Sequence, residues 1–495
     1  MSRATRLGPV AAIVGFLAFV EFTSGIIQGY YTPLLTDIAR NLGIHDADVN
    51  WLEGTQLMLS ALVVPAFAKL GDMVGHKRML VWSTAITAIA SISLAFTDQF
   101  WVFLVAWALQ GFYVVWLPLE IALIWSRSRG SAHPAAMTRT AAGLLVAALE
   151  LGAIAGALSA GALAEVLPMT ALLLVPAVAV TVCFFVVLFG VKESPDLTGG
   201  RLDTGGLVLI SLSLLALTGG LSFMRLNGPA DLLSWALVVL GVLLVWPFAR
   251  YELRHPDPLI DVRMFRSPML WPVFLTAGLF GVSVLGAQAP LSTFARTDPS
   301  AVGYGLGATS FQTSLLIGSY VLSMVVGAML FPVFARRFTP RVTLIGASSM
   351  VAVGFLLFLP FHDGYGQVLA NMIIVGLGSG ALVAALPAAA AAAAPPTQTG
   401  VATGLTNSVK TVGGAIASCV FGIALLGSAG EAVHGTAGSF AGYMTVWLIC
   451  GVTAAVAAGL LALVPKLAFS DPVDAEPPAD PTTGGGDVGA SAAVR

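Results

Sequence analysis

The sequence predicts an all-α membrane protein with 14 transmembrane helices. Of its 495 residues, 57% are hydrophobic and only 10% are charged, and the mean hydropathy is +0.90. A soluble protein carries roughly 25% charged residues. Apolar runs of the length that spans a bilayer, about 20 residues, recur along the chain. Lipid must therefore be the solvent for most of this protein.

Short segments rich in Gly, Pro, Asp and His separate the apolar runs. We place the expected helices near residues 8–31, 51–69, 79–97, 101–124, 140–163, 170–191, 206–223, 232–249, 269–290, 309–334, 342–360, 366–388, 403–427 and 441–464. The first run is longer than the 7–15 residues of a signal-peptide core and lacks a small-residue cleavage site. We therefore expect it to be the first transmembrane helix.

The positive charges predict the orientation. If the N-terminus is cytoplasmic, 18 of the 23 Lys and Arg residues fall in or beside cytoplasmic loops. Such a bias towards the cytoplasm is the rule for membrane proteins. We expect a multi-pass protein of the cell membrane, of bacterial origin, with both termini in the cytoplasm. Residues 471–495, which have no apolar face, are expected to form a disordered cytoplasmic tail.

Composition also argues against several classes of ligand. The net charge of −2 shows no basic excess that would indicate a nucleic-acid partner. The three cysteines stand alone in apolar runs, and the six histidines fall between or at the ends of such runs. These residues offer no ligand set for a metal or haem within the membrane. We predict no cofactor and no metal, and expect a monomer.

A charged segment follows the second run, AKLGDMVGHKRML at residues 68–80. It resembles the signature between helices 2 and 3 of the major facilitator superfamily, with Asp72, Gly75, Lys77 and Arg78 at matching positions. Asp72 can cap a helix end and pair with a cation, and Gly75 permits a tight turn. The resemblance implies that these four residues form a cytoplasmic gate.

The fifth run contains glycines at spacings that resemble the helix 5 signature of the antiporters of this family. Gly152 and Gly156 lie on one stripe, where small residues let two helices approach closely. Ala157 replaces the usual Pro of this signature. In helix 4, Gln110-Gly111 also resembles a family signature, but Trp107 stands where an Arg is usual.

The segment YYTPLLTDI, residues 30–38, is similar to the end of helix 1 in the fourteen-span drug:proton antiporters. This resemblance implies a six-helix bundle over residues 1–197, a two-helix insertion over 198–255 and a second bundle over 256–470. It also implies a proton-coupled transporter that exports small hydrophobic compounds, such as drugs or secondary metabolites, by alternating access.

Other functions fit parts of this pattern. An importer or a uniporter of a small molecule remains open, as does a receptor that does not transport. An intramembrane enzyme using paired acids has no support from a metal motif, a nucleophile elbow or a phosphate loop, so we do not expect an enzyme.

Three carboxylates lie inside the predicted spans: Glu21, Glu120 and Glu150. A charged side chain in mid-membrane costs roughly 2.5–3.5 kcal/mol, and protonation lowers that cost. Such a group can take up or release a proton as its access to water changes, so all three are candidates for proton coupling. Since Glu150 lies opposite the Gly152 stripe, we expect it to face a helix of its own bundle, such as helix 1.

Polar and aromatic residues on shared helical faces predict a substrate cavity between the bundles. The candidates are Gln28, Tyr113, Trp116, Gln288, Gln312 and Asn371. The second half has no carboxylate inside a span, and Lys410 is expected to extend from the cytoplasmic end of its helix towards water.

Overall fold

A computed structural model describes residues 11–128, 134–193, 202–256, 258–394, 399–426 and 436–463. All the regular secondary structure in these ranges is helical. Thirteen helical segments of the described residues are long and apolar enough to cross a membrane. This confirms the prediction of an all-α, multi-pass membrane protein. The tail predicted to be disordered, residues 471–495, lies outside the described residues.

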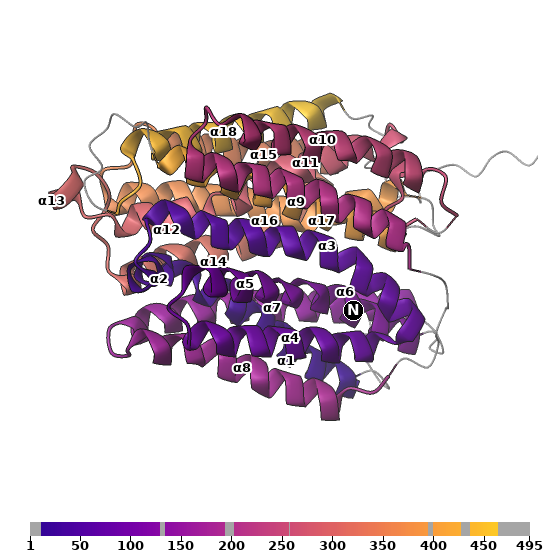
Figure 1. Ribbon diagram of the computed structural model, residues 1–495. Helices are drawn as coiled ribbons and strands as arrows, with labels where there is room; N and C mark the ends of the chain where they lie inside the picture. The colour runs from indigo at the N-terminus through magenta and orange to yellow at the C-terminus, as the bar shows by residue number, and fades with distance from the viewer. Residues whose placement is uncertain are drawn as a thin grey trace, which may run out of the picture.

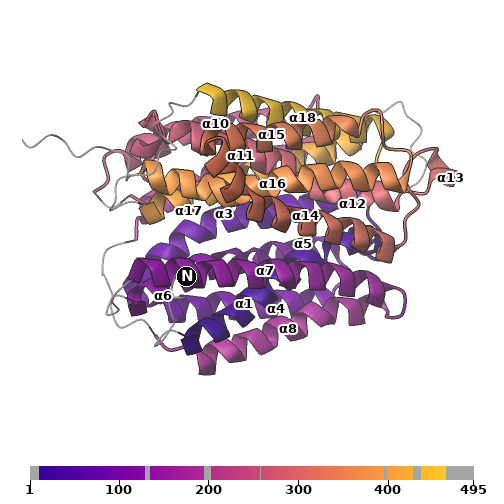
Figure 2. The ribbon, with the colours of Figure 1, turned by 180° about the vertical axis from the view of Figure 1, so that it is seen from behind.

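The first half of the chain builds one group of helices, which occupies the lower part of Figures 1 and 2. These helices are α1 (Ala11–Tyr30), α2 (Leu35–Leu42), α3 (Val49–Val74), α4 (His76–Ala95), α5 (Phe100–Gln110), α6 (Trp116–Ser128), α7 (Pro134–Ala164) and α8 (Met169–Gly190). Large side chains such as Leu17, Phe103 and Trp116 are fully buried in its core.

The last part of the chain builds a second group with its own core, in the upper part of the same views. Its helices are α11 (Trp271–Phe280), α12 (Gln288–Arg296), α13 (Pro299–Val302), α14 (Ser310–Arg337), α15 (Pro340–Leu357), α16 (Tyr365–Ala393), α17 (Thr399–Leu425) and α18 (Phe440–Leu463). Phe294, Phe358 and Trp447 are among its fully buried residues. The two groups, called here the first half and the second half, meet where α3 packs on α17 and α7 packs on α14.

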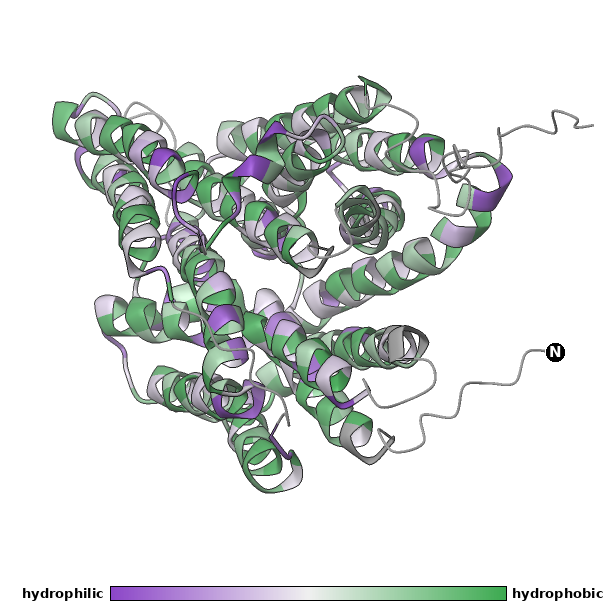
Figure 3. Ribbon diagram, turned by 90° about the vertical axis from the view of Figure 1, so that its right-hand side faces the viewer, coloured by the Kyte–Doolittle hydropathy of each residue, from purple (hydrophilic) through white to green (hydrophobic). Residues whose placement is uncertain are grey.

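Helices α9 (Thr204–Asn227) and α10 (Leu232–Glu252) form a pair beside the two halves. Helix α9 touches both α3 and α17, and its Leu221 packs with Trp51 and Cys419. Only 17% of the apolar stretch of α10 is buried in the protein. In Figure 3 the helices are mostly hydrophobic on their outward turns, as a surface in contact with lipid requires.

Two predicted helices are interrupted rather than continuous. A 3-10 turn, Gly111–Val115, separates α5 from α6, and a π-helical turn, Gly281–Leu285, follows α11. The glycine at each break allows close contact with a neighbour. A Cβ at Gly111 would lie 2.7 Å from the Gln56 carbonyl oxygen, and one at Gly281 would lie in the Lys410 carbonyl. Apolar periodicity alone could not show these breaks, because they arise from contacts between helices.

The face of α7 that carries Glu150 packs against a different helix from the one we expected. Gly152 and Gly156 pack against α1, since a Cβ at Gly152 would lie in the carbonyl of Phe22. The opposite face, with Ala157 and Gly161, packs against α14 of the second half. Glu150 lies on this second face, so the prediction that it faces helix 1 was wrong: the glycines, which permit the closest approach, take that place.

Candidate functional site

A small cavity lies between the halves, and both halves contribute to its walls. It is lined by Ile27, Gln28, Tyr31, Thr32, Glu53, Gln56, Leu57, Trp107, Tyr113, Leu285 and Gln288. Three of the predicted cavity residues are therefore brought together: Gln28, Tyr113 and Gln288. Its volume of about 40 Å³ suffices for a few water molecules only. In this conformation it is too small for a drug-sized compound.

The other predicted cavity residues lie elsewhere. Trp116 is fully buried in the core of the first half and packs edge-on against Tyr113. Gln312 closes a capping box with Thr309 at the start of α14. Asn371 is buried and donates to the Phe361 carbonyl oxygen over 2.8 Å. Trp116 therefore belongs to the core of the first half, and Gln312 and Asn371 make contacts near helix ends of the second half.

Trp107 is the residue that takes the place of the usual Arg. It is buried, lines the cavity and packs on Tyr31, with 4.9 Å between ring centroids. The hydroxyl group of Tyr31 in turn accepts a hydrogen bond of 2.8 Å from Gln110 Nε2. An aromatic cluster fixed by hydrogen bonds therefore occupies this wall, where a cation would otherwise stand.

Two of the three candidate acids form a pair inside the first half. Glu21 on α1 and Glu120 on α6 interact with each other, and both side chains are fully buried. No described residue donates a hydrogen bond to any of their four carboxyl oxygens. A carboxylate can only accept hydrogen bonds, so direct contact requires a proton on one of the two. This site can therefore hold and release a proton.

The acid pair and the cavity share two helical segments. Gln28 lies seven residues after Glu21 on α1, so these two share a helical face, whereas Tyr113 lies in the 3-10 turn that precedes α6 and Glu120. Seven residues of helix correspond to about 10 Å. Tyr113 also interacts with Gln28, and it interacts electrostatically with Glu21. A short polar route therefore leads from the cavity to the buried acids.

The third acid, Glu150, is half-buried and interacts electrostatically with Lys410 of α17. Lys410 lies 11 residues into α17, about 16 Å from its first residue. The prediction that Lys410 extends from the helix end was wrong, because it faces a carboxylate across the two halves. The described ion pairs do not include this one, so the two groups are more than 4 Å apart here.

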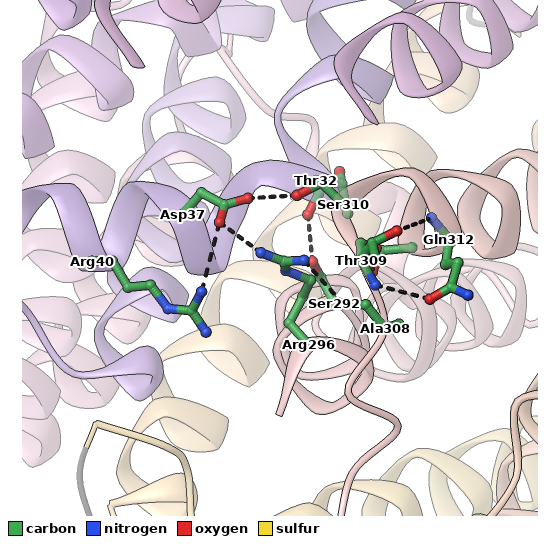
Figure 4. A network of polar contacts seen from close by, with 10 residues as sticks. Thr32, Asp37, Arg40, Ser292, Arg296, Ala308, Thr309, Ser310 and Gln312 are labelled. Atoms are coloured by element: carbon green, nitrogen blue, oxygen red, sulfur yellow. Dashed lines mark hydrogen bonds and ion pairs between the residues drawn. The ribbon is translucent and has the colours of Figure 1, made fainter. Parts of the chain in front are cut away.

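A polar network joins the halves at the end of the molecule where α2 and α12 lie (Figure 4). Arg296 Nη2 donates to Asp37 Oδ1 over 2.7 Å, and Ser310 Oγ donates to Asp37 Oδ2 over 2.9 Å. Ser292 Oγ donates to the Thr32 carbonyl oxygen. The side chains of Arg296 and Asp37 are only 12% and 22% exposed, so this network excludes most water. It closes this end of the interface.

Sequence reasoning missed this network, although a signal existed. Arg296 was one of the few basic residues assigned to the side where Lys and Arg are rare. A cation on that side, close to the membrane, needs a specific partner. Its partner Asp37 lies shortly after the Thr32–Leu34 turn that follows the first apolar run.

The predicted gate residues lie together at the opposite end. Gly75 has φ +122°, a conformation that favours glycine, and a Cβ there would lie 2.5 Å from Glu193 Oε2. The Glu193 carboxylate accepts from the backbone N–H groups of Lys77 and Arg78, which caps α4. Asp72 lies 3.2 Å from His76 Nε2. The capping residue is therefore Glu193, which sequence reasoning did not single out.

Two groups of helices with separate cores, a polar cavity between them and buried acids beside it define a membrane transporter that alternates between two openings. The profile of the Major Facilitator Superfamily matches residues 17–418 and, in a second match, 297–489. The chain belongs to this superfamily.

Relatives and solved structures agree with this assignment. The chain is 27% identical to the cephamycin export protein CmcT of Amycolatopsis lactamdurans, over 95% of this chain and 94% of that protein. It is 26% identical to the puromycin resistance protein pur8 of Streptomyces alboniger, over 88% of this chain and 86% of that protein. An auto-inhibited peptide transporter of the POT family shares the fold, with a TM-score of 0.65 and 15% identity, over 92% of this chain and 99% of that one.

Proposed function

We propose that this protein exports small hydrophobic compounds, drugs or secondary metabolites, in exchange for protons. The observation that carries the proposal is the buried Glu21–Glu120 pair, which has no cation among its described ion pairs and lies next to a polar cavity. The names of the relatives, a cephamycin export protein and a puromycin resistance protein among them, support the outward direction.

The proposed architecture has 14 spans, in two bundles of six with an inserted pair. Helix α1, with 20 residues, packs against α7 and α8 and adds one span to the thirteen. The bundles cover residues 1–197 and 256–470, and α9 and α10 lie in the insertion 198–255. The distribution of Lys and Arg supports a cytoplasmic location for both termini and for the loop of Asp72. The Asp37–Arg296 network is then at the outer end.

In this orientation the described conformation is closed to the outside. The outward-facing state requires the Asp37–Arg296 contact to break while the cytoplasmic ends approach each other. Glu150 and Lys410, which lie on facing helices but apart, would then close into a direct ion pair. The halves would then exchange the contact at the outer end for an ion pair near the middle of α7 and α17. The Asp72 cluster would stabilise the cytoplasmic end.

Proton exchange at the acid pair provides the coupling. A proton entering from outside would neutralise the Glu21–Glu120 pair and favour the state closed to the outside. Its release to the cytoplasm would leave a buried charge that water or cargo in the cavity must compensate. Protons therefore move inwards as compounds move outwards.

Transport in inverted vesicles tests this proposal. The vesicles are acidified inside, and puromycin, ethidium and a cephamycin are each added while a dye reports the proton gradient. We expect wild-type protein to release protons with at least one compound. Glu21→Gln and Glu120→Gln should each reduce this release by about tenfold or more, because an amide cannot take up a proton. The matched control is Glu165→Gln, an exposed acid at the end of α7.

Two failures can be told apart. Full proton release in both Glu21→Gln and Glu120→Gln would refute the coupling role of the pair. If the wild type moves labelled compound across the membrane without any proton movement, the protein is a uniporter instead.

A further inference from the structure

A second pocket lies at the end of α10, away from the cavity between the halves. It is lined by Trp246, Pro247, Arg250, Tyr251, Arg254, His255 and Pro256, and its volume is about 510 Å³. Arg250 lies in the last turn of α10 and Arg254 in the turn that follows the helix, and both side chains are exposed. The proposed transport cycle uses none of these residues.

The pocket lies at the depth where the hydrocarbon of a bilayer ends. Helix α10 is capped by Asp231 at one end, and Arg250 follows 19 residues later, which is about 28 Å of helix. The hydrocarbon core is about 30 Å thick. Since α10 is the least buried of the candidate spans, lipid surrounds it up to this level.

The positive charge of the pocket is not neutralised by described residues. The Arg250 guanidinium lies 4.7 Å from the centre of the Trp246 ring. Neither Arg250 nor Arg254 has a side-chain hydrogen bond or ion pair within the described ranges. Two buried acids neighbour residues that line the pocket: Glu252 follows Tyr251, and Asp203 lies 3.9 Å from His255 Nδ1 and accepts from the Gly206 N–H to cap α9. The two guanidinium groups that line the pocket therefore have no anionic partner among the described residues.

We propose that this pocket binds the phosphate group of an anionic phospholipid from the adjacent leaflet. Guanidinium groups bind phosphate oxygens in pairs, and basic pockets at this depth recognise anionic head groups. The exposed apolar side chains of α10, Leu243 and Trp246 among them, lie where the acyl chains would run. In the proposed orientation this leaflet is the cytoplasmic one.

Native mass spectrometry of the full-length protein, titrated with phosphatidylglycerol or phosphatidylcholine, tests the proposal. We expect a bound phosphatidylglycerol with clear preference over phosphatidylcholine. The double variant Arg250→Ala/Arg254→Ala should bind it roughly thirtyfold more weakly, from the usual contribution of two basic residues. The matched control is Arg336→Ala/Arg337→Ala, which removes an exposed arginine pair from the last turn of α14.

Arg250→Lys/Arg254→Lys guards against misfolding, because it retains the charge and should keep most of the binding. Equal weakening in both alanine doubles would overturn the proposal in favour of diffuse attraction to the surface. Absence of a preference for phosphatidylglycerol would also overturn it. Displacement of the lipid by equimolar glycerol 3-phosphate would assign the pocket to a soluble phosphate compound instead.

Discussion

Helix α7 has two faces that pack in different ways. On one face Gly152 and Gly156 bring α7 backbone to backbone with α1, inside the first half. On the other face Glu150, Ala157 and Gly161 meet the second half, through α14 and Lys410. The first contact leaves no room for movement, whereas the second combines small apolar residues with charges whose partners can change. The difference indicates which interfaces hold a half together and which open during transport.

The largest effect is expected at the outer network, where an ion pair joins the halves. Arg296→Ala removes the cation that reaches Asp37 from the second half and leaves only Arg40 of the first half, 3.9 Å away. The cost to the closed state is on the order of 2 kcal/mol, a shift of roughly thirtyfold towards opening. A cysteine at Gln288, in the cavity beneath, should react correspondingly faster with an impermeant maleimide. The native cysteines in the described ranges are buried.

Arg225→Ala is the control for this measurement. Arg225 also pairs with an acid at this end, since its Nε donates to Asp48 over 2.7 Å, but it joins α9 to the first half. Equal labelling in both variants would show that the Asp37–Arg296 contact has no special role in closing the interface.

A substitution in the α1–α7 contact, within the first half, should affect stability and not the opening of the interface. Gly152→Ala puts a methyl group into the backbone of Phe22, and overpacking of this kind costs about 1–3 kcal/mol. We expect a lower melting temperature in detergent and unchanged labelling at Gln288. Gly143→Ala on the same helix meets no atom within 4 Å and should melt like the wild type. Equal melting of both variants would contradict close packing of α1 on α7.

The smallest effect concerns the pair that is apart in this conformation. Lys410→Glu places like charges on facing helices and should slow transport by about threefold to tenfold, since coupling energies of such pairs are about 0.5–3 kcal/mol. The exchanged double variant, Glu150→Lys/Lys410→Glu, should recover most of the rate. A double variant as slow as the sum of its single changes would show that the two residues do not act on each other.

The sequence was sufficient for the features that depend on composition and local periodicity. The helical class follows from apolar runs, and the turn at Gly75 follows from its signature. Features created by contacts between distant helices were not predictable. Glu21 and Glu120 were each recognised, yet 99 residues separate them, and nothing in either helix shows that their carboxyl groups meet. The helical wheel placed Glu150 opposite the glycines, but it could not say which neighbour took which face.

The position of α9 limits how the halves can swing. Because this helix rests on α3 and α17 together, with Leu221 touching residues of both, it spans the seam that must open and close. A rotation of either half has to slide its surface along α9, and the Asp48–Arg225 pair anchors that helix to the first half. The additional helix pair would therefore restrict the second half to one direction of movement, along the surface of α9.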